Sequence, residues 1–72
     1  MNKKNKIKIV VNGRRLTVNF KFSIKNLIEK LKTPIDKVAI ELNEEIVDKK
    51  KLNKIFLKNK DKIEIVHFIG GG

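Results

Sequence analysis

The chain has 72 residues, enough for one small domain, and it contains no cysteine, which excludes disulfides, thiol nucleophiles and thiolate metal sites. Its 18 Lys and Arg against eight Asp and Glu give a formal net charge of +10, above the magnitude of about 2–8 that is usual for a small soluble domain. No apolar run approaches the roughly 20 residues of a membrane span, and the N-terminus lacks the apolar segment of a signal peptide, so we expect a cytoplasmic protein.

The positive charge admits two interpretations. An excess of cations attracts nucleic acids, anionic membranes and acidic protein surfaces. On the other hand, Lys, Asn and Ile make up 35 of the 72 residues, as an A/T-rich gene would favour, and 16 of the 18 cations are Lys. Because dedicated phosphate-binding sites tend to use the bidentate Arg side chain, a solvated lysine surface is the simpler interpretation.

The N-terminal third predicts a β-hairpin. In residues 7–11 every second side chain is apolar, so Ile7, Ile9 and Val11 lie on one face, as in a half-buried strand. Asn12-Gly13 follows, and both residues tolerate the positive φ of a type I′ turn. The second strand, residues 15–20, places three apolar side chains on one face: Leu16, Val18 and Phe20.

A short helix is expected after the hairpin. Ser23 is a suitable N-cap, because its hydroxyl accepts a hydrogen bond from a free backbone N–H of the first turn. Apolar residues then recur at the spacing of one helix face: Ile24, Leu27, Ile28 and Leu31. Thr33-Pro34 is expected to end the helix, since a residue that precedes proline is disfavoured in the α region.

The second half of the chain predicts three more strands. Residues 38–42 form one strand, Asn43-Glu44 forms a turn, and residues 45–47 form a short strand at a sheet edge. Residues 48–60 are expected to be a loop with a short helical turn that buries Leu52, Ile55 and Leu57.

The last predicted strand, residues 63–68, has two distinct faces. Ile63 and Ile65 lie on one side, and Glu64, Val66 and Phe68 lie on the other.

The order of elements is β, β, α, β, β, β, which indicates an α+β fold. A hairpin, a crossing helix and a returning last strand describe the β-grasp (ubiquitin-like) fold, with a mixed sheet of four to five strands and one helix packed across one face. In this fold the last strand pairs centrally, next to the first strand. We therefore expect a β-grasp domain over residues 1–68 and a flexible tail over residues 69–72.

The chain ends in Gly70-Gly71-Gly72, which accounts for three of its four glycines. Glycine has no Cβ, so such an end is thin and conformationally free. Together with Val10-Val11-Asn12-Gly13, the segment Glu41 to Val47 and the segment Ile63 to Gly72, this ending resembles the ThiS family of sulfur carriers in thiamine biosynthesis, over essentially the whole chain.

Two departures from the family pattern accompany this resemblance. Glu44 stands where the family often has glycine, so we expect a different geometry in that turn. The high positive charge is also atypical of the family.

The resemblance implies a carrier rather than an enzyme. An E1-like adenylating enzyme (ThiF-like) would use ATP and a metal ion to activate the Gly72 carboxylate, and a persulfide donor would convert it to a thiocarboxylate. Thiazole synthase (ThiG-like) would then receive the sulfur. The chain itself would bind no cofactor and no metal.

The residues before Gly72 would form the partner-binding tail. Gly70 and Gly71 would allow it to enter a narrow active site, and Val66, Phe68 and Ile69 would dock on partners. For Val66 and Phe68, the alternative is that they simply complete the core.

Two other functions remain open from the sequence. A carrier for molybdopterin synthesis or tRNA thiolation has a similar end. A small basic RNA-binding domain is supported by the cluster Lys49, Lys50, Lys51, Lys54, Lys58, Lys60 and Lys62. It is opposed by the absence of Trp and Tyr and by the assignment of most of the four Phe to the core, since single-strand binders rely on aromatic stacking. Nucleic acid is therefore not an expected partner.

Catalytic constellations are lacking in the sequence. His67 is the single histidine and has no Cys, Ser or second His at a useful spacing for a metal site or a triad. No phosphate-binding glycine motif is present.

Overall fold

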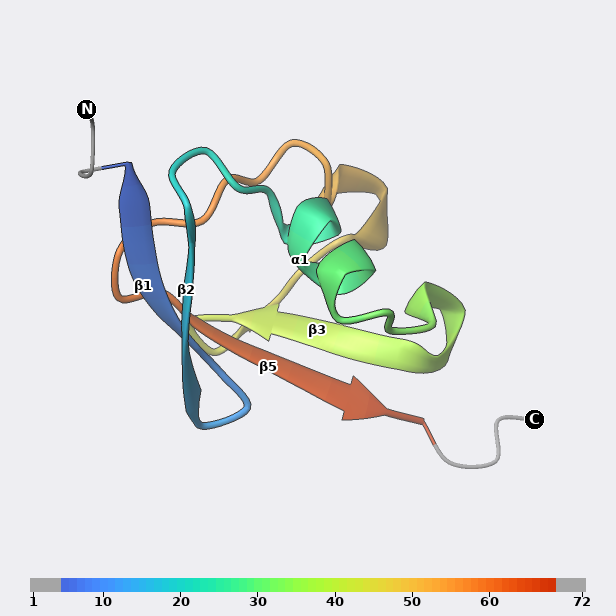
Figure 1. The fold of residues 1–72 in the computed structure, drawn as a ribbon. Helices are drawn as coiled ribbons and strands as arrows, with labels where there is room; N and C mark the ends of the chain where they lie inside the picture. Colours follow the sequence, from blue (N-terminus) through green and yellow to red (C-terminus); the bar gives the residue numbers. More distant parts are fainter. Residues whose placement is uncertain (1–4, 69–72) are drawn as a thin grey trace.

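The computed structural model describes residues 5–68, which form a sheet with a helix across one face (Figure 1). Within these residues the sheet has five strands in the order β2-β1-β5-β3-β4. Their bounds are Lys6–Val11 (β1), Arg14–Asn19 (β2), Val38–Leu42 (β3), Glu45–Ile46 (β4) and Lys62–His67 (β5). The last strand is central, parallel to β1 and antiparallel to β3. This topology is that of the predicted β-grasp fold.

Helix α1, Ile24–Lys30, begins as the sequence predicts. The Ser23 hydroxyl accepts a hydrogen bond from the backbone N–H of Asn26, and the Asn26 side chain accepts one from the N–H of Ser23, each at 3.0 Å. This reciprocal capping box satisfies two backbone donors at the helix start.

The end of α1 differs from the sequence prediction. Lys32 has a φ of 54°, and the N–H groups of Lys32 and Thr33 donate to the carbonyls of Glu29 and Ile28. This Schellman arrangement ends the helix before the segment preceding Pro34 is reached. Leu31 is the C-cap and is exposed, so the prediction that it continues the buried stripe is wrong.

The core lies between α1 and the sheet. Ile9, Ile24, Leu27, Ile40 and Ile63 are its largest fully buried side chains. They come from three strands and the helix, which explains how a domain of this size forms one continuous apolar cluster. No helix among residues 5–68 is long and apolar enough to cross a membrane.

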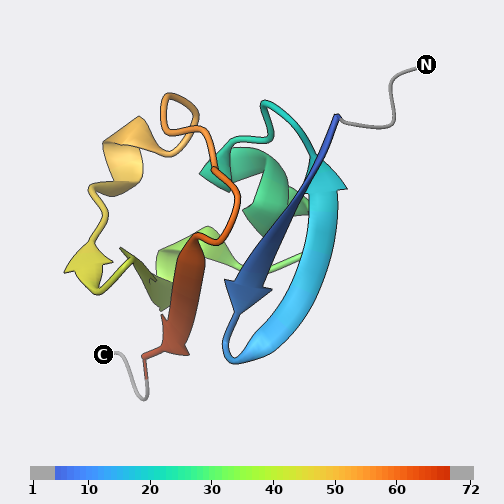
Figure 2. The same cartoon turned by 90° about the vertical axis from the view of Figure 1, so that its left-hand side faces the viewer.

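The segment between β4 and β5 packs against the loop before α1 (Figure 2). It contains the 3₁₀ turn η2, Lys49–Lys51, and a similar turn, η1 (Ile35–Lys37), precedes β3. Leu52 and Leu57 are buried and Ile55 packs on the core. The predicted loop with a short helical turn is confirmed, whereas η1 was missed.

Both hairpin turns have positive φ at their two central residues. The φ angles are 50° and 83° at Asn12 and Gly13, and 52° and 72° at Asn43 and Glu44. The first turn confirms the type I′ prediction. The expectation of a different geometry at Glu44 is wrong: the backbone there keeps a positive φ like that of Gly13, although a side chain disfavours it.

The aromatic side chains are more exposed than the sequence suggested. Phe20 lies beyond the end of β2, next to Lys21 with its φ of 66°, and is 57% exposed. Phe56 and Phe68 are 53% and 54% exposed, and Phe22 alone among the four Phe packs against the core. The assignment of most of the Phe side chains to the core is therefore wrong.

Candidate functional site: the exit of the last strand

Strand β5 carries the chain out of the middle of the sheet (Figure 1). Its end is paired on one side with β3, where His67 lies opposite Val38 and Val66 opposite Ala39. The backbone N–H of Phe68 donates to the carbonyl of Lys37 at 2.9 Å, which extends this pairing one residue beyond the strand. Phe68, the last described residue, is thus held by a backbone hydrogen bond to the residue that precedes β3.

On its other side β5 is held by the turn after β1. The parallel ladder pairs Val11 with Ile63, and the backbone N–H of Asn12 then donates to the Ile63 carbonyl at 2.9 Å. The Asn12 side chain continues the ladder: its Oδ1 accepts from the N–H of Ile65 at 2.7 Å, and its Nδ2 donates to the Ile65 carbonyl at 3.3 Å. The Asn-Gly pattern indicates the positive φ of Asn12 but not this second role of its side chain.

Asn43, in the other hairpin turn, holds the start of β5 in a similar way. Its Oδ1 accepts from the N–H of Lys62 at 2.9 Å, and its Nδ2 donates to Asp61 Oδ1 at 3.0 Å. Asn43 therefore braces the start of the central strand, and Asn12 braces it at Ile65. A side-chain amide is suited to this task because it provides both an acceptor and donors.

The two apolar side chains at the end of β5 point away from the core. Val66 is 52% exposed and Phe68 is 54% exposed, while Ile63 and Ile65 are buried. The prediction that these pairs face opposite sides is confirmed, and the alternative that Val66 and Phe68 complete the core is wrong. Lys49 Nζ lies 5.3 Å from the centroid of the Phe68 ring, within the range of a cation–π contact.

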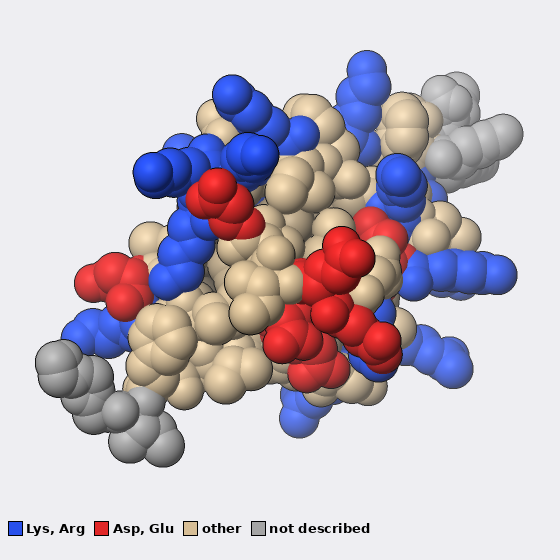
Figure 3. Space-filling model, turned by 180° about the vertical axis from the view of Figure 1, so that it is seen from behind, with Lys and Arg blue, Asp and Glu red and all other residues tan. Residues whose placement is uncertain are grey.

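Acidic residues lie on the same outer face of the sheet. Glu41 and Glu64 are paired between β3 and β5, and Ile46, which pairs with Glu41 from β4, is strongly exposed. Figure 3, which shows the molecule from behind, has acidic side chains gathered on one part of the surface, with Lys and Arg around them. The outer face of β5 thus carries Glu64 before the exposed Val66, whereas the charged group in contact with Phe68 at the exit is the Lys49 ammonium.

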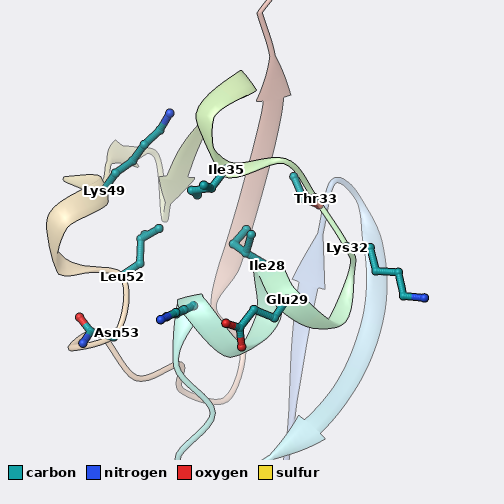
Figure 4. A pocket seen from close by; sticks show the side chains of 9 residues that line it. Ile28, Glu29, Lys32, Thr33, Ile35, Lys49, Leu52 and Asn53 are labelled. Carbon is teal, nitrogen blue, oxygen red and sulfur yellow. The ribbon is translucent and has the colours of Figure 1, made fainter.

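A groove of about 450 Å³ lies between α1, η1 and η2. Its apolar lining comes from Ile28, Ile35 and Leu52, and Lys32 and Lys49 are among its polar residues (Figure 4). Lys49 also contacts Phe68, so this groove adjoins the exit of β5. No local sequence pattern indicates this groove, because its residues come from three separate segments.

The remaining predicted site residues, Ile69, Gly70, Gly71 and Gly72, lie outside the described residues. His67 lies at the end of β5 and is exposed. Among residues 5–68 no group of three or more His, Cys, Asp or Glu side chains is placed to hold a metal ion.

Comparison with known proteins places the chain in a family. A model described as "ThiS family" matches residues 9–72. A crystal structure of the thiamine biosynthesis protein ThiS from Geobacter metallireducens superposes with a TM-score of 0.77 at 29% identity, covering 92% of this chain and 100% of that chain.

Two curated relatives are also similar in sequence. The sulfur carrier protein ThiS of Bacillus subtilis is 49% identical over 35 residues, which are 49% of this chain and 53% of that protein. The thiazole synthase of Paramagnetospirillum magneticum is 38% identical over 66 residues, or 92% of this chain, but the chain spans only 20% of that protein's length. Because the family model covers nearly the whole chain, from the first strand to the terminal glycines, the chain belongs to the ThiS family.

Proposed function

We propose that this chain is a sulfur carrier for thiazole formation in thiamine biosynthesis, and that its reactive group is the α-carboxylate of Gly72. The observation that carries the proposal is the match of the family model through residue 72, which includes the three glycines. The structure supports it with a central strand that leads directly toward this end and is braced on both sides.

The chemistry follows from the weakness of a carboxylate as an electrophile. A Gly72 carboxylate oxygen attacks the α-phosphorus of ATP, and pyrophosphate leaves, which gives an acyl-adenylate. The terminal sulfur of an enzyme persulfide attacks the acyl carbon and AMP leaves. A thiol then cleaves the resulting acyl disulfide; the thiocarboxylate departs, and the thiol becomes part of a disulfide. The partners supply the ATP site, the metal ion and the persulfide, and this chain supplies the acyl group.

The end of β5 would dock on the adenylating enzyme. Val66 and Phe68 offer exposed apolar area, and the neighbouring Glu41 and Glu64 favour a partner surface with basic groups at its rim. Residues 69–72 span at most about 14 Å when extended. Gly70 and Gly71 would let this short segment pass through a narrow channel while the folded domain remains outside.

Thiazole synthase is the proposed acceptor of the sulfur. In the Paramagnetospirillum magneticum protein of that name, the segment similar to this chain makes up a fifth of the length. A carrier segment and an acceptor segment joined in one protein would act on each other, which supports thiazole synthase as the acceptor for this carrier as well.

The test is intact-mass spectrometry of the full chain after incubation with ATP, Mg²⁺, an E1-like adenylating enzyme and hydrosulfide as the sulfur source. We expect one oxygen to be replaced by one sulfur at Gly72. The loaded carrier should then support thiazole formation by thiazole synthase. A chain that stays unmodified while a known carrier is loaded in parallel would overturn the proposal, and loading without transfer to thiazole synthase would exclude this pathway.

A further inference from the structure

A second exposed aromatic surface lies at the opposite end of the molecule from the exit of β5. The loop after β2 and the segment before β5 meet there (Figures 1 and 2). The N–H of Leu57 donates to the Phe22 carbonyl at 2.8 Å, and Ser23 and Phe56 form an isolated antiparallel bridge. Between the two segments is a cleft of about 410 Å³ lined by Phe20, Lys21, Phe56, Leu57 and Lys58.

The two phenylalanines of this cleft do not contribute to the buried core. Phe20 follows the end of β2, and Phe56 stands between the partly buried Ile55 and the buried Leu57, so both rings are more than half exposed. Neither belongs to the core cluster or to the side chains packed on it. Single exposed apolar residues are common on protein surfaces, but two exposed rings that line the same cleft indicate a binding surface.

The charged residues that line the cleft are both cationic, and the nearest acid the structure shows is Asp61, whose Oδ2 accepts from the backbone N–H of Lys58 at 2.7 Å. The two segments that form it lie within residues 5–28 and 49–60, and neither stretch contains a single Asp or Glu. All eight acids of the chain fall in residues 29–48 and 61–64. Lys21 and Lys58 line the cleft, and Lys21 Nζ lies 6.0 Å from the Phe20 ring centroid. The lining therefore suits a ligand that is anionic and also presents flat apolar groups.

We infer that this cleft, called here the Phe20–Phe56 cleft, binds single-stranded nucleic acid. Bases stack on the rings of Phe20 and Phe56, and the phosphates between them are neutralised by Lys21 and Lys58. Every base offers an aromatic face, so the binding depends little on sequence. This inference does not rest on the carrier function, because the cleft and the exit of β5 share no residue.

The exposure of these Phe side chains also answers the objection to RNA binding that follows from the sequence. That objection was the lack of free aromatic side chains, and three of the four Phe are exposed. An acidic protein partner would use the lysines of the cleft but has no need for two open rings. A second copy of this chain would have to bring one cationic surface against another, which like-charge repulsion opposes.

The test is fluorescence anisotropy of the full chain with a labelled oligouridylate of about ten nucleotides, a length within the range of small single-strand sites. The variant Phe20→Ala/Phe56→Ala should bind about 10-fold or more weakly, since stacking contributes about 1–3 kcal/mol per base. Phe68→Ala is the matched control: it removes an equally exposed ring at the other end of the molecule and should bind as the wild type does.

Charge is tested separately from stacking. Lys21→Ala/Lys58→Ala should reduce the slope of log affinity against log salt by about 1.4, as expected for two lost phosphate contacts to a single strand. Inorganic polyphosphate serves as a probe without bases, and its affinity should be unchanged by the double Phe substitution. The variant Phe20→Leu/Phe56→Leu keeps the apolar volume if the alanine variant fails to fold, and it should also lose affinity for the oligouridylate.

Three outcomes would overturn the inference. The first is that the wild-type chain fails to bind the oligouridylate at low salt. The second is that the folded double Phe variants bind it as tightly as the wild type, which would mean that the lysines alone account for binding. The third is that Phe68→Ala weakens binding as much as the double variants do. A Phe-dependent dimer in sedimentation without oligouridylate binding would instead assign the cleft to self-association.

Discussion

The side chain of Asn12 hydrogen-bonds both backbone groups of Ile65: Oδ1 accepts from its N–H at 2.7 Å and Nδ2 donates to its carbonyl at 3.3 Å. Strand β1 has already ended at Val11, so this side chain acts as one further rung of the parallel ladder. It extends the bonding of β5 on the β1 side as far as Ile65, and the last residues of the strand are paired with β3. The position of the exit is thus fixed by a residue 53 positions away in sequence.

Substitution of Asn12 tests this brace. Asn12→Gly keeps the positive φ accessible but removes both hydrogen bonds and leaves the partly buried N–H of Ile65 without its acceptor. We expect a loss of about 1–3 kcal/mol in the free energy of unfolding, measured by urea denaturation. Hydrogen exchange at the Ile65 amide should accelerate in parallel. Asn12→Ala should lose a further 1 kcal/mol or so through backbone strain. A glycine variant as stable as the wild type would show that the side-chain bonds contribute nothing.

Phe68 should matter to partners more than to the fold. Its ring is 54% exposed, so Phe68→Ala should change the free energy of unfolding by no more than about 0.5 kcal/mol. Affinity for an E1-like adenylating enzyme, measured by titration calorimetry, should fall. Phe20→Ala is the matched control, because it removes a similarly exposed ring far from the exit and should leave this affinity unchanged. If Phe68→Ala instead lowers the free energy of unfolding and leaves the affinity for the adenylating enzyme unchanged, the ring stabilises the fold and does not bind this partner.

Gly71 lies outside the described residues, and its role is tested through the chemistry. Gly71→Val adds a β-branched side chain to the thin end of the chain and restricts its backbone. We expect no thiocarboxylate by intact mass and an unchanged melting temperature. Gly71→Ala should give partial loading, because a methyl group obstructs less. Full loading of the valine variant would mean that the adenylating enzyme has room for a side chain at this position.

Glu44 offers a stabilising substitution. A residue with a side chain at a φ of 72° carries a conformational penalty that glycine avoids. Glu44→Gly should therefore raise the free energy of unfolding by about 0.5–1 kcal/mol, after allowance for the greater freedom of glycine in the unfolded chain. The exposed Glu44–Lys62 ion pair, with an N···O distance of 3.7 Å, is lost without much effect.

Glu45→Gly is the control for this substitution. Glu45 is the neighbouring strand residue of β4, where glycine weakens the pairing with Leu42. Thermal melting should therefore show opposite shifts for the two variants. Equal destabilisation by both would mean that the turn stores no strain at Glu44.

The sequence predicted those features that depend on local pattern. Alternation located β1, β3 and β5, and the Ser23 cap located the start of α1, because short-range spacing and capping chemistry decide both. The end of α1 was attributed to Pro34, whereas backbone geometry at Lys32 ends it earlier. Nothing in the residue type of a lysine signals a left-handed conformation, so this feature is visible only in the structure.

The candidate site was predictable only in part. The two faces of β5 followed from alternation, so the directions of Val66 and Phe68 were correct. The brace by Asn12 and the groove beside Lys49 join residues distant in sequence, and no local pattern encodes them. The exposure of Phe20 was missed for a related reason: an aromatic residue at the end of a strand is assigned to the core unless the turn that follows it is known.

The central position of β5 also bears on how the protein is made. In the order β2-β1-β5-β3-β4, the last strand of the described residues stands between the two hairpins. A translation product that stops before residue 62 would hold two hairpins with apolar faces and nothing to join them, and such intermediates are prone to aggregation and degradation. We therefore expect only chains that extend through β5 to complete the sheet, because β5 is the strand that pairs with both hairpins.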